Sequence, residues 1–199
     1  MARIRTMAGI PRTADPVSQN VPPSPSEPER RTSRLGLAAR DIERRLKLVD
    51  FGEQDLARVK AVRSAVVEST NRLTEYFFDY LGQFDEANAL VRDPQILKEA
   101  KRRKREHLVA MLRGEYDIIY VEQRERLGML YLKAGLDLQL FLGAFHVLMH
   151  RIGEEIMRRS IADPMAGFTS FISLKKVAFF DLAIIVDVLL DEQGRSIAA

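Results

Sequence analysis

Apolar residues recur every three to four positions along most of the chain, beginning at Leu35. This spacing places them on one face of a helix, and no segment alternates between apolar and polar residues for long enough to predict a strand. The pattern therefore predicts an all-α fold. The predicted helices cover residues 37–48, a pair within 53–84, then 94–113, 117–133, 137–159 and 167–192.

Local signals mark several of the helix ends. Asp93 precedes Pro94, which is the order of an N-cap and a proline at the first helical position. Asp137 stands at the N-cap position of the helix that follows it. Gly114 and Gly135 come where two helices end, and glycine is the residue that best tolerates the left-handed conformation found at such ends. We therefore expect breaks at these four residues.

The last predicted helix contains the segment VAFFDLAIIVDVLL at residues 177–190, which is apolar on every face. A helix of this kind is buried all round. A domain of this size has little mass with which to surround one helix, so we expect a second copy of the chain to cover one side. The helices at 137–159 and 167–192 would then form the interface of a homodimer. The alternative is that the helix lies wholly inside its own core.

Residues 1–34 have the composition of a disordered tail. The first 35 residues hold six of the eight prolines and six arginines, with only three acidic residues. Such a segment cannot bury enough apolar surface to fold. The rest of the chain has equal numbers of basic and acidic residues, so the net charge of +3 comes from the tail. A neutral body argues against binding to nucleic acid.

The chain is 46% apolar and contains no cysteine, which suits a reducing compartment. No apolar run reaches the roughly 20 residues that a membrane-spanning helix needs, and the N-terminus lacks the apolar centre of a signal peptide. We therefore expect a cytoplasmic protein with no membrane span. Glycine-rich phosphate loops and nucleophile motifs are also absent, so we expect no enzymatic activity.

Residues 120–149, YVEQRERLGMLYLKAGLDLQLFLGAFHVLM, resemble the globin-coupled sensor family of bacterial haem-based sensors. The family pattern is an aromatic residue, R-x-x-I/L-G-x-x-H-x-x-x-G-L, an aromatic pair and G-A-F. The resemblance extends over about residues 36–192. It implies a globin-like helical sandwich with an extra N-terminal helix over residues 35–193, followed by a linker or C-terminal tail from 194–199. It also implies an output module, on the same chain or on a separate protein.

One position departs from the family pattern. The proximal histidine, which binds the haem iron in the family, falls at Tyr131. A tyrosine binds iron only as phenolate and favours the ferric state. The usual distal tyrosine falls at Phe78, and a pocket-facing threonine position falls at Arg103. Arg103 belongs to the basic run 101–105, and we expect it to be the member that points toward the pocket, where it would pair with a haem propionate.

Three interpretations of Tyr131 stay open from the sequence. The residue is the metal ligand of a ferric haem, or it fills a collapsed pocket without haem, or haem binds through a substitute ligand such as His107. The candidate residues for binding haem are Phe77, Phe78, Arg103, His107, Leu127, Tyr131 and Phe141.

The sequence thus predicts a globin-type sensor domain that detects a diatomic gas or a redox state through haem. The event would be relayed by helix movement at the dimer interface. The alternative is a haem-free globin that serves as a regulatory protein-interaction or structural module. A haem enzyme of the dioxygenase or peroxidase type would need a distal acid–base group, which Phe78 does not supply.

Overall fold

The computed structural model describes residues 33–197, with side chains through Asp191, and every regular element in that range is helical. This confirms the all-α prediction. The disordered tail predicted for 1–34 lies almost wholly outside the described residues. The elements are α2 (Ala39–Leu48), α3 (Glu53–Ala61), α4 (Arg63–Val67), α5 (Thr70–Leu81), the short 3-10 helix Asp85–Ala87, α6 (Asn88–Val91), α7 (Pro94–Met111), α8 (Ile118–Lys133), α9 (Leu138–Arg159) and α10 (Pro164–Ile197).

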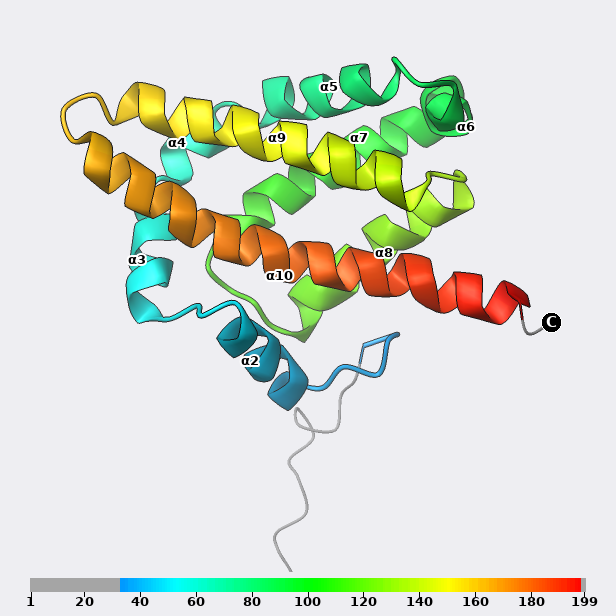
Figure 1. Ribbon diagram of the computed structural model, residues 1–199, viewed down its shortest axis with the longest axis horizontal. Helices are drawn as coiled ribbons and strands as arrows, with labels where there is room; N and C mark the ends of the chain where they lie inside the picture. Colours follow the sequence, from blue (N-terminus) through cyan, green and yellow to red (C-terminus); the bar gives the residue numbers. More distant parts are fainter. Residues whose placement is uncertain (1–32, 198–199) are drawn as a thin grey trace, which may run out of the picture.

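The two longest helices, α9 and α10, run side by side across one face of the molecule and are joined by a short loop (Figure 1). Behind them lie α5, α7 and α8. α10 packs against α8, α9 and α3, whereas α5 packs against α9 and α7. The core therefore lies between α9 and α10 on one side and α5, α7 and α8 on the other.

The helix starts predicted at Asp93 and Asp137 are confirmed, since each carboxylate accepts hydrogen bonds from backbone N–H groups of the next turn. Asp117, which was not predicted as a cap, accepts one from the N–H of Tyr120 at the start of α8. Each carboxylate satisfies N–H groups that the helix itself leaves without a partner. Gly114 and Gly135 have φ angles of 79° and 68°, the left-handed conformation expected where α7 and α8 end.

The segment at 53–84 is divided more finely than the sequence predicts, into α3, α4 and α5. α3 packs on α10, whereas α4 packs on α9, so one straight helix could not make both contacts. The periodicity of apolar residues persists through the break because both pieces still turn one face inward. The short α6 is also absent from the prediction. At the other end of the chain, α10 continues to Ile197, beyond the end expected at residue 192.

α8 and α10 approach closely where they cross. A Cβ atom added at Gly128 would lie only 3.1 Å from Cβ of Val188 on α10, so a larger residue here would require Val188 to shift by a few tenths of an ångström. The inner side of α10 buries Val177, Ala178, Ile184 and Ile185, whereas Phe179 remains half exposed. None of the helices in the described range is long and apolar enough to cross a membrane.

Candidate functional site

Five of the residues predicted to bind haem meet in the main hydrophobic core. They are contributed by three helices and comprise Phe77 and Phe78 from α5, Leu127 and Tyr131 from α8, and Phe141 from α9. All five are at most 3% exposed. The sequence-based grouping of these residues thus corresponds to one region of the structure, which we call the inner core.

Tyr131 lies at the centre of the inner core and is 0% exposed. Its ring centroid is 6.2 Å from that of Phe77 and 5.6 Å from that of Phe141. Its hydroxyl group has no hydrogen-bond partner among the described residues. A buried hydroxyl without a partner costs about 1–3 kcal/mol of folding free energy, so the aromatic contacts hold Tyr131 at this place in spite of its hydroxyl.

The inner core does not leave room for a haem between α5 and α8. Aromatic side chains whose centroids are about 4.5–7 Å apart are in direct contact, and Phe77 and Tyr131 fall inside that range. A porphyrin is itself a flat aromatic layer. If the resemblance holds, it would lie between Tyr131, at the proximal position, and α5, which carries Phe77 next to the distal position Phe78. The two rings would have to separate before it could enter. In this conformation the residues present therefore do not fit a haem.

The inner core also contains a buried cation, Lys104 on α7. This residue is 0% exposed, and its ammonium nitrogen lies 4.1 Å from the ring centroid of Phe77 and 5.7 Å from that of Phe145. The nitrogen has no hydrogen-bond partner in the described part of the chain. Its contacts with the two ring faces are cation–π interactions, which compensate only part of the loss of hydration.

The position of Lys104 corrects the expectation for Arg103. The sequence predicts that Arg103 points toward the pocket, but its side chain is 29% exposed and pairs with Glu99 at 2.6 Å. Helical register explains the difference. Lys104 lies four residues from both Ala100 and Leu108, which are buried, so it shares their inward face. Arg103 is turned by about 100° from that face.

A second polar group is buried beside the inner core, around Asp181 of α10. Its carboxylate accepts a hydrogen bond of 2.6 Å from the hydroxyl of Tyr120 and one of 2.7 Å from Nε2 of His107. The guanidinium of Arg124 lies 3.8 Å from the same carboxylate and donates to the backbone carbonyl of His107 at 3.3 Å. All four side chains are at most 3% exposed. They connect α7 and α8 to α10, and we call them the Asp181 cluster.

Burial determines the protonation states in this region. It lowers the pKa of His107 to about 3, an effect that Arg124 reinforces and Asp181 opposes. His107 is therefore neutral, and its Nε2–H donates to Asp181, which has only acceptor atoms to offer. Burial, again reinforced by Arg124, lowers the pKa of Lys104 to about 7. The pKa of the Tyr131 hydroxyl is raised well above its usual value by burial, so a phenolate is disfavoured in the closed core.

These assignments separate His107 from the haem question. Its Nε2 is engaged with Asp181, and only Nδ1 has no partner among the described residues. Ligation of iron through Nε2, as a substitute ligand, would require His107 to leave Asp181. The arrangement is that of a structural histidine that joins two helices.

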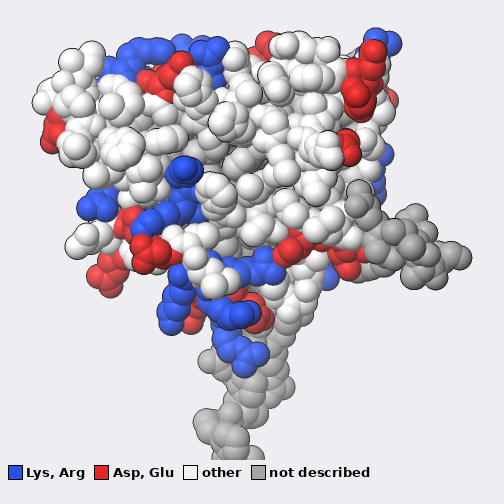
Figure 2. Space-filling model, viewed as in Figure 1, with Lys and Arg blue, Asp and Glu red and all other residues white. Residues whose placement is uncertain are grey.

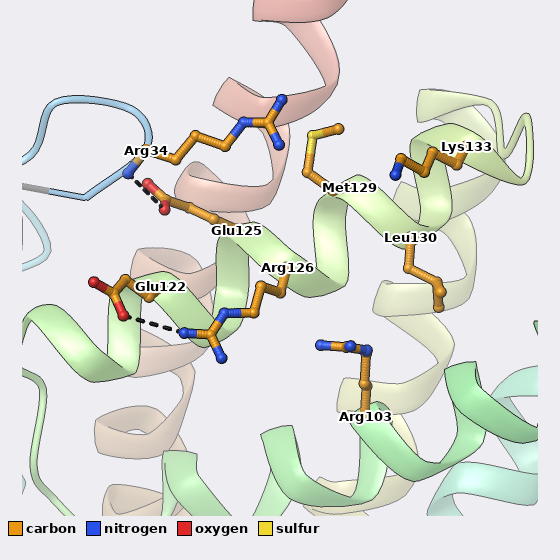
Figure 3. Close-up of a pocket in the computed structure, with 8 residues that line it drawn as sticks. All are labelled: Arg34, Arg103, Glu122, Glu125, Arg126, Met129, Leu130 and Lys133. Atoms are coloured by element: carbon orange, nitrogen blue, oxygen red, sulfur yellow. Dashed lines mark hydrogen bonds and ion pairs between the residues drawn. The ribbon is translucent and has the colours of Figure 1, made fainter.

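Outside the core, a groove of about 590 Å³ runs along the outer edge of α7 and α8. Arg103 reaches into it from α7, and the α8 side chains Met129 and Leu130 form an apolar wall (Figure 3). Arg34 also lines the groove (Figure 3). Its position is fixed by Glu125, which accepts hydrogen bonds from the hydroxyl of Ser33 and from the backbone N–H groups of Arg34 and Leu35. Arg103 thus belongs to a surface groove rather than to the inner core.

Of the buried polar residues described above, only His107 was among the site residues predicted from the sequence. Lys104, Tyr120, Arg124 and Asp181 were not. One signal was present, because Asp181 interrupts an otherwise apolar segment. A carboxylate in the middle of such a segment predicts a buried partner, but the partner lies on another helix and cannot be named from local spacing. The choice of Lys104 over Arg103 depends on the rotation of α7 against α5, which also lies beyond local sequence patterns.

Comparison with known proteins supports the resemblance. The chain matches the family model Protoglobin over residues 38–195. The heme-based aerotactic transducer HemAT of Halobacterium salinarum is 23% identical over 171 residues, which cover 81% of this chain and 35% of that protein. This chain therefore spans about a third of the length of that relative.

The structural comparison agrees. The globin domain of a Geobacter sulfurreducens globin-coupled sensor superposes with a TM-score of 0.65 at 18% sequence identity, covering 73% of this chain and 95% of that domain. This confirms the predicted globin-like sandwich. Since the family model covers all the helices from α2 to α9 and nearly all of α10, the chain belongs to the protoglobin family.

Proposed function

We propose that this domain is a non-catalytic sensor globin that relays its signal through α9 and α10 in a homodimer. The observation that carries the proposal is the distribution of exposed apolar side chains. Of the ten large exposed apolar residues in the described range, eight lie between residues 142 and 190. They are Leu142, Met157, Ile161, Met165, Phe168, Ile172, Phe179 and Leu190.

Figure 2 shows the same face in space-filling form. A broad uncharged area covers α9 and α10, and most Lys, Arg, Asp and Glu side chains lie toward its edges. Large exposed apolar side chains that gather on an uncharged face are uncommon on a monomer and indicate an interaction site. A self-complementary face on two long helices suits a two-fold symmetric dimer.

The Asp181 cluster supplies a physical route from the core to that interface. Asp181 belongs to α10, whereas its donors Tyr120 and His107 belong to α8 and α7. A shift of α7 or α8 therefore either moves α10 or breaks buried hydrogen bonds. A ligand would exploit this connection if it bound one arrangement of the helices more tightly than the other.

The named relative is a heme-based transducer, and that kinship supports haem as the sensing group here too. The sequence also left open a haem-free sensor globin, and the inner core favours this alternative. The rings of Tyr131 and Phe77 are in contact in the region where the resemblance would place a porphyrin. We therefore propose that the input is not a gas bound to haem iron. The output module and the cytoplasmic location expected from the sequence remain predictions.

Sedimentation velocity at micromolar concentration tests the dimer directly. The proposal expects a species of twice the monomer mass, with no dependence on added haem. A monomer under these conditions would overturn the relay, because no partner helices would be available to receive the signal.

A further inference from the structure

A cavity of about 180 Å³ lies between α7 and α8, and none of the five inner-core residues Phe77, Phe78, Leu127, Tyr131 and Phe141 lines it. Most of its lining is positively charged. It is formed by Arg102, Arg103, Glu106, Gln123, Arg124 and Arg126. Four guanidinium groups thus face one small space with a single carboxylate among them. We call this space the arginine cavity.

Three of the arginines are partly neutralised by carboxylates of the outer surface. Arg102 pairs with Glu99 at 2.7 Å and with Glu106 at 2.5 Å, and Arg103 shares Glu99. Arg126 pairs with Glu122 at 3.1 Å. These pairs are accessible to water, and surface pairs of this kind contribute about 0–1 kcal/mol each. They therefore leave the arginines free to turn toward a stronger anion.

Arg124 differs from the other three because it is buried. Its side chain is 1% exposed, its Nε has no hydrogen-bond partner among the described residues, and its nearest carboxylate, Asp181, is 3.8 Å away. A buried guanidinium with an unused donor is costly. It is also the donor that an anion in the cavity would reach at its inner end.

The groove described above adjoins the arginine cavity, because Arg103 and Arg126 line both. Farther along it are Lys133 and the apolar wall of Met129 and Leu130 (Figure 3). No described carboxylate pairs with Lys133. The two spaces together offer a positively charged site for an anionic group and, next to it, an apolar surface.

We propose that the arginine cavity binds the terminal phosphate of a small molecule whose apolar body lies along Met129 and Leu130. Several planar guanidinium groups around one space favour phosphate, which can accept paired hydrogen bonds on more than one side. A second space adjoins the cavity on another side, because Glu106 and Gln123 line both. We place the apolar body on the groove side, where Met129 and Leu130 lie next to the shared Arg103 and Arg126. The equal numbers of basic and acidic residues outside the N-terminal tail argue against a nucleic acid strand as the occupant.

The site also suggests how binding would be sensed, and this step rests on the proposed relay function. A phosphate on Arg124 competes with Asp181 for the same guanidinium. Asp181 belongs to α10, which carries the proposed dimer face. Binding would therefore weaken one link between α8 and α10 and favour a different position of α10.

The binding step is tested by isothermal titration of the full chain with phenyl phosphate, benzoate and inorganic phosphate in phosphate-free buffer at pH 7.5. We expect phenyl phosphate to bind more tightly than inorganic phosphate and benzoate to bind least. The double variant Arg103→Gln/Arg126→Gln should lose about tenfold or more in affinity for phenyl phosphate. The control Arg40→Gln/Arg92→Gln removes the same charge elsewhere and should change affinity by less than about twofold.

Two results would overturn the site. One is an equal loss in both double variants, which would mean attraction by overall charge. The other is a short RNA that binds more tightly than phenyl phosphate and loses affinity in the same arginine variant, which would assign the surface to nucleic acid. Both arginines are accessible, so the variants should retain helical circular dichroism.

The relay step has a separate readout. The chain has no native cysteine, so Lys175→Cys gives one spin label on each protomer of α10. We expect phenyl phosphate to shift the label-to-label distance in the wild-type background and not with Arg103→Gln/Arg126→Gln. Binding without a shift would refute the relay and leave the phosphate site standing, whereas a shift without loss in the variant would refute the site.

Discussion

The ring of Tyr131 on α8 lies directly against the ring of Phe77 on α5, with centroids 6.2 Å apart and planes inclined by 31°. The sequence resemblance predicts the family's proximal ligand at Tyr131 and its distal residue at Phe78, next to Phe77. In the structure both sides of this region form continuous hydrophobic core. The hydroxyl of Tyr131 and the ammonium of Lys104 remain in that core as polar groups without hydrogen-bond partners in the described chain.

The first prediction compares two buried tyrosines of α8. Tyr131→Phe removes a hydroxyl that has no partner and should raise the free energy of unfolding by about 1 kcal/mol. Tyr120→Phe removes the donor to Asp181 and should lower it by about 1–3 kcal/mol. Urea denaturation of both variants provides the measurement. If Tyr131→Phe is the more destabilising of the two, its hydroxyl has a partner or a function that the closed core does not show.

The second prediction concerns the dependence of stability on pH. The pKa of Lys104 is about 7 in the folded chain and about 10.5 when unfolded, so between these values the unfolded state binds more protons. The free energy of unfolding should therefore rise with pH from 7 to 9, by up to about 1.4 kcal/mol per pH unit. Denaturation across this range measures the slope.

Lys104→Met is the matched variant for that slope. This variant should be more stable than the wild type at pH 7. Its free energy of unfolding should rise much less between pH 7 and pH 9. Lys101→Met is the control, because Lys101 also lies on α7 with a side chain only 23% exposed but pairs with Glu75. Its free energy of unfolding should rise with pH as in the wild type. A wild-type slope near zero would mean that Lys104 keeps its proton in the folded chain.

The third prediction tests the proposed dimer face. Phe179→Glu places a charge at an apolar residue of α10 that is 50% exposed, and it should give monomers without loss of helix content. Leu48→Glu at the end of α2 is the control, because Leu48 is 72% exposed and does not belong to α9 or α10. Analytical ultracentrifugation separates the outcomes. Equal dimer stability in the two variants would place the interface elsewhere.

Much of the fold could be predicted from the sequence because its signals are local. The starts of α7, α8 and α9 follow from Asp93, Asp117 and Asp137, whose side chains bond to the backbone only two or three residues away. The break between α3 and α4 could not be predicted, because it depends on which distant helix each piece contacts.

The candidate site, too, could be predicted only in part from the sequence. Tyr131, Phe77 and Phe141 could be grouped because the family pattern fixes their positions in sequence. Whether their rings stand apart or touch depends on how α5, α8 and α9 pack, and no local pattern encodes that. The same limit applies to Lys104, since one residue of helical rotation decides whether it or Arg103 faces inward.

The fourth prediction is for Tyr131→His, which restores the family's proximal residue. An imidazole at this position is still covered by Phe77, and Lys104 still lies over that ring. We expect no carbon monoxide difference spectrum after incubation with haem and dithionite. A sharp Soret band with carbon monoxide would show that the rings separate readily and that only the ligand was missing.

The most direct test of the account is a titration of the wild-type chain with haem, followed by its visible spectrum. The contact between Tyr131 and Phe77 predicts only the broad absorption of free haem, with no endpoint at one haem per chain and no change in the thermal midpoint. A sharp Soret band that saturates at one haem per chain, and disappears in Tyr131→Phe, would contradict the haem-free interpretation and make Tyr131 the iron ligand.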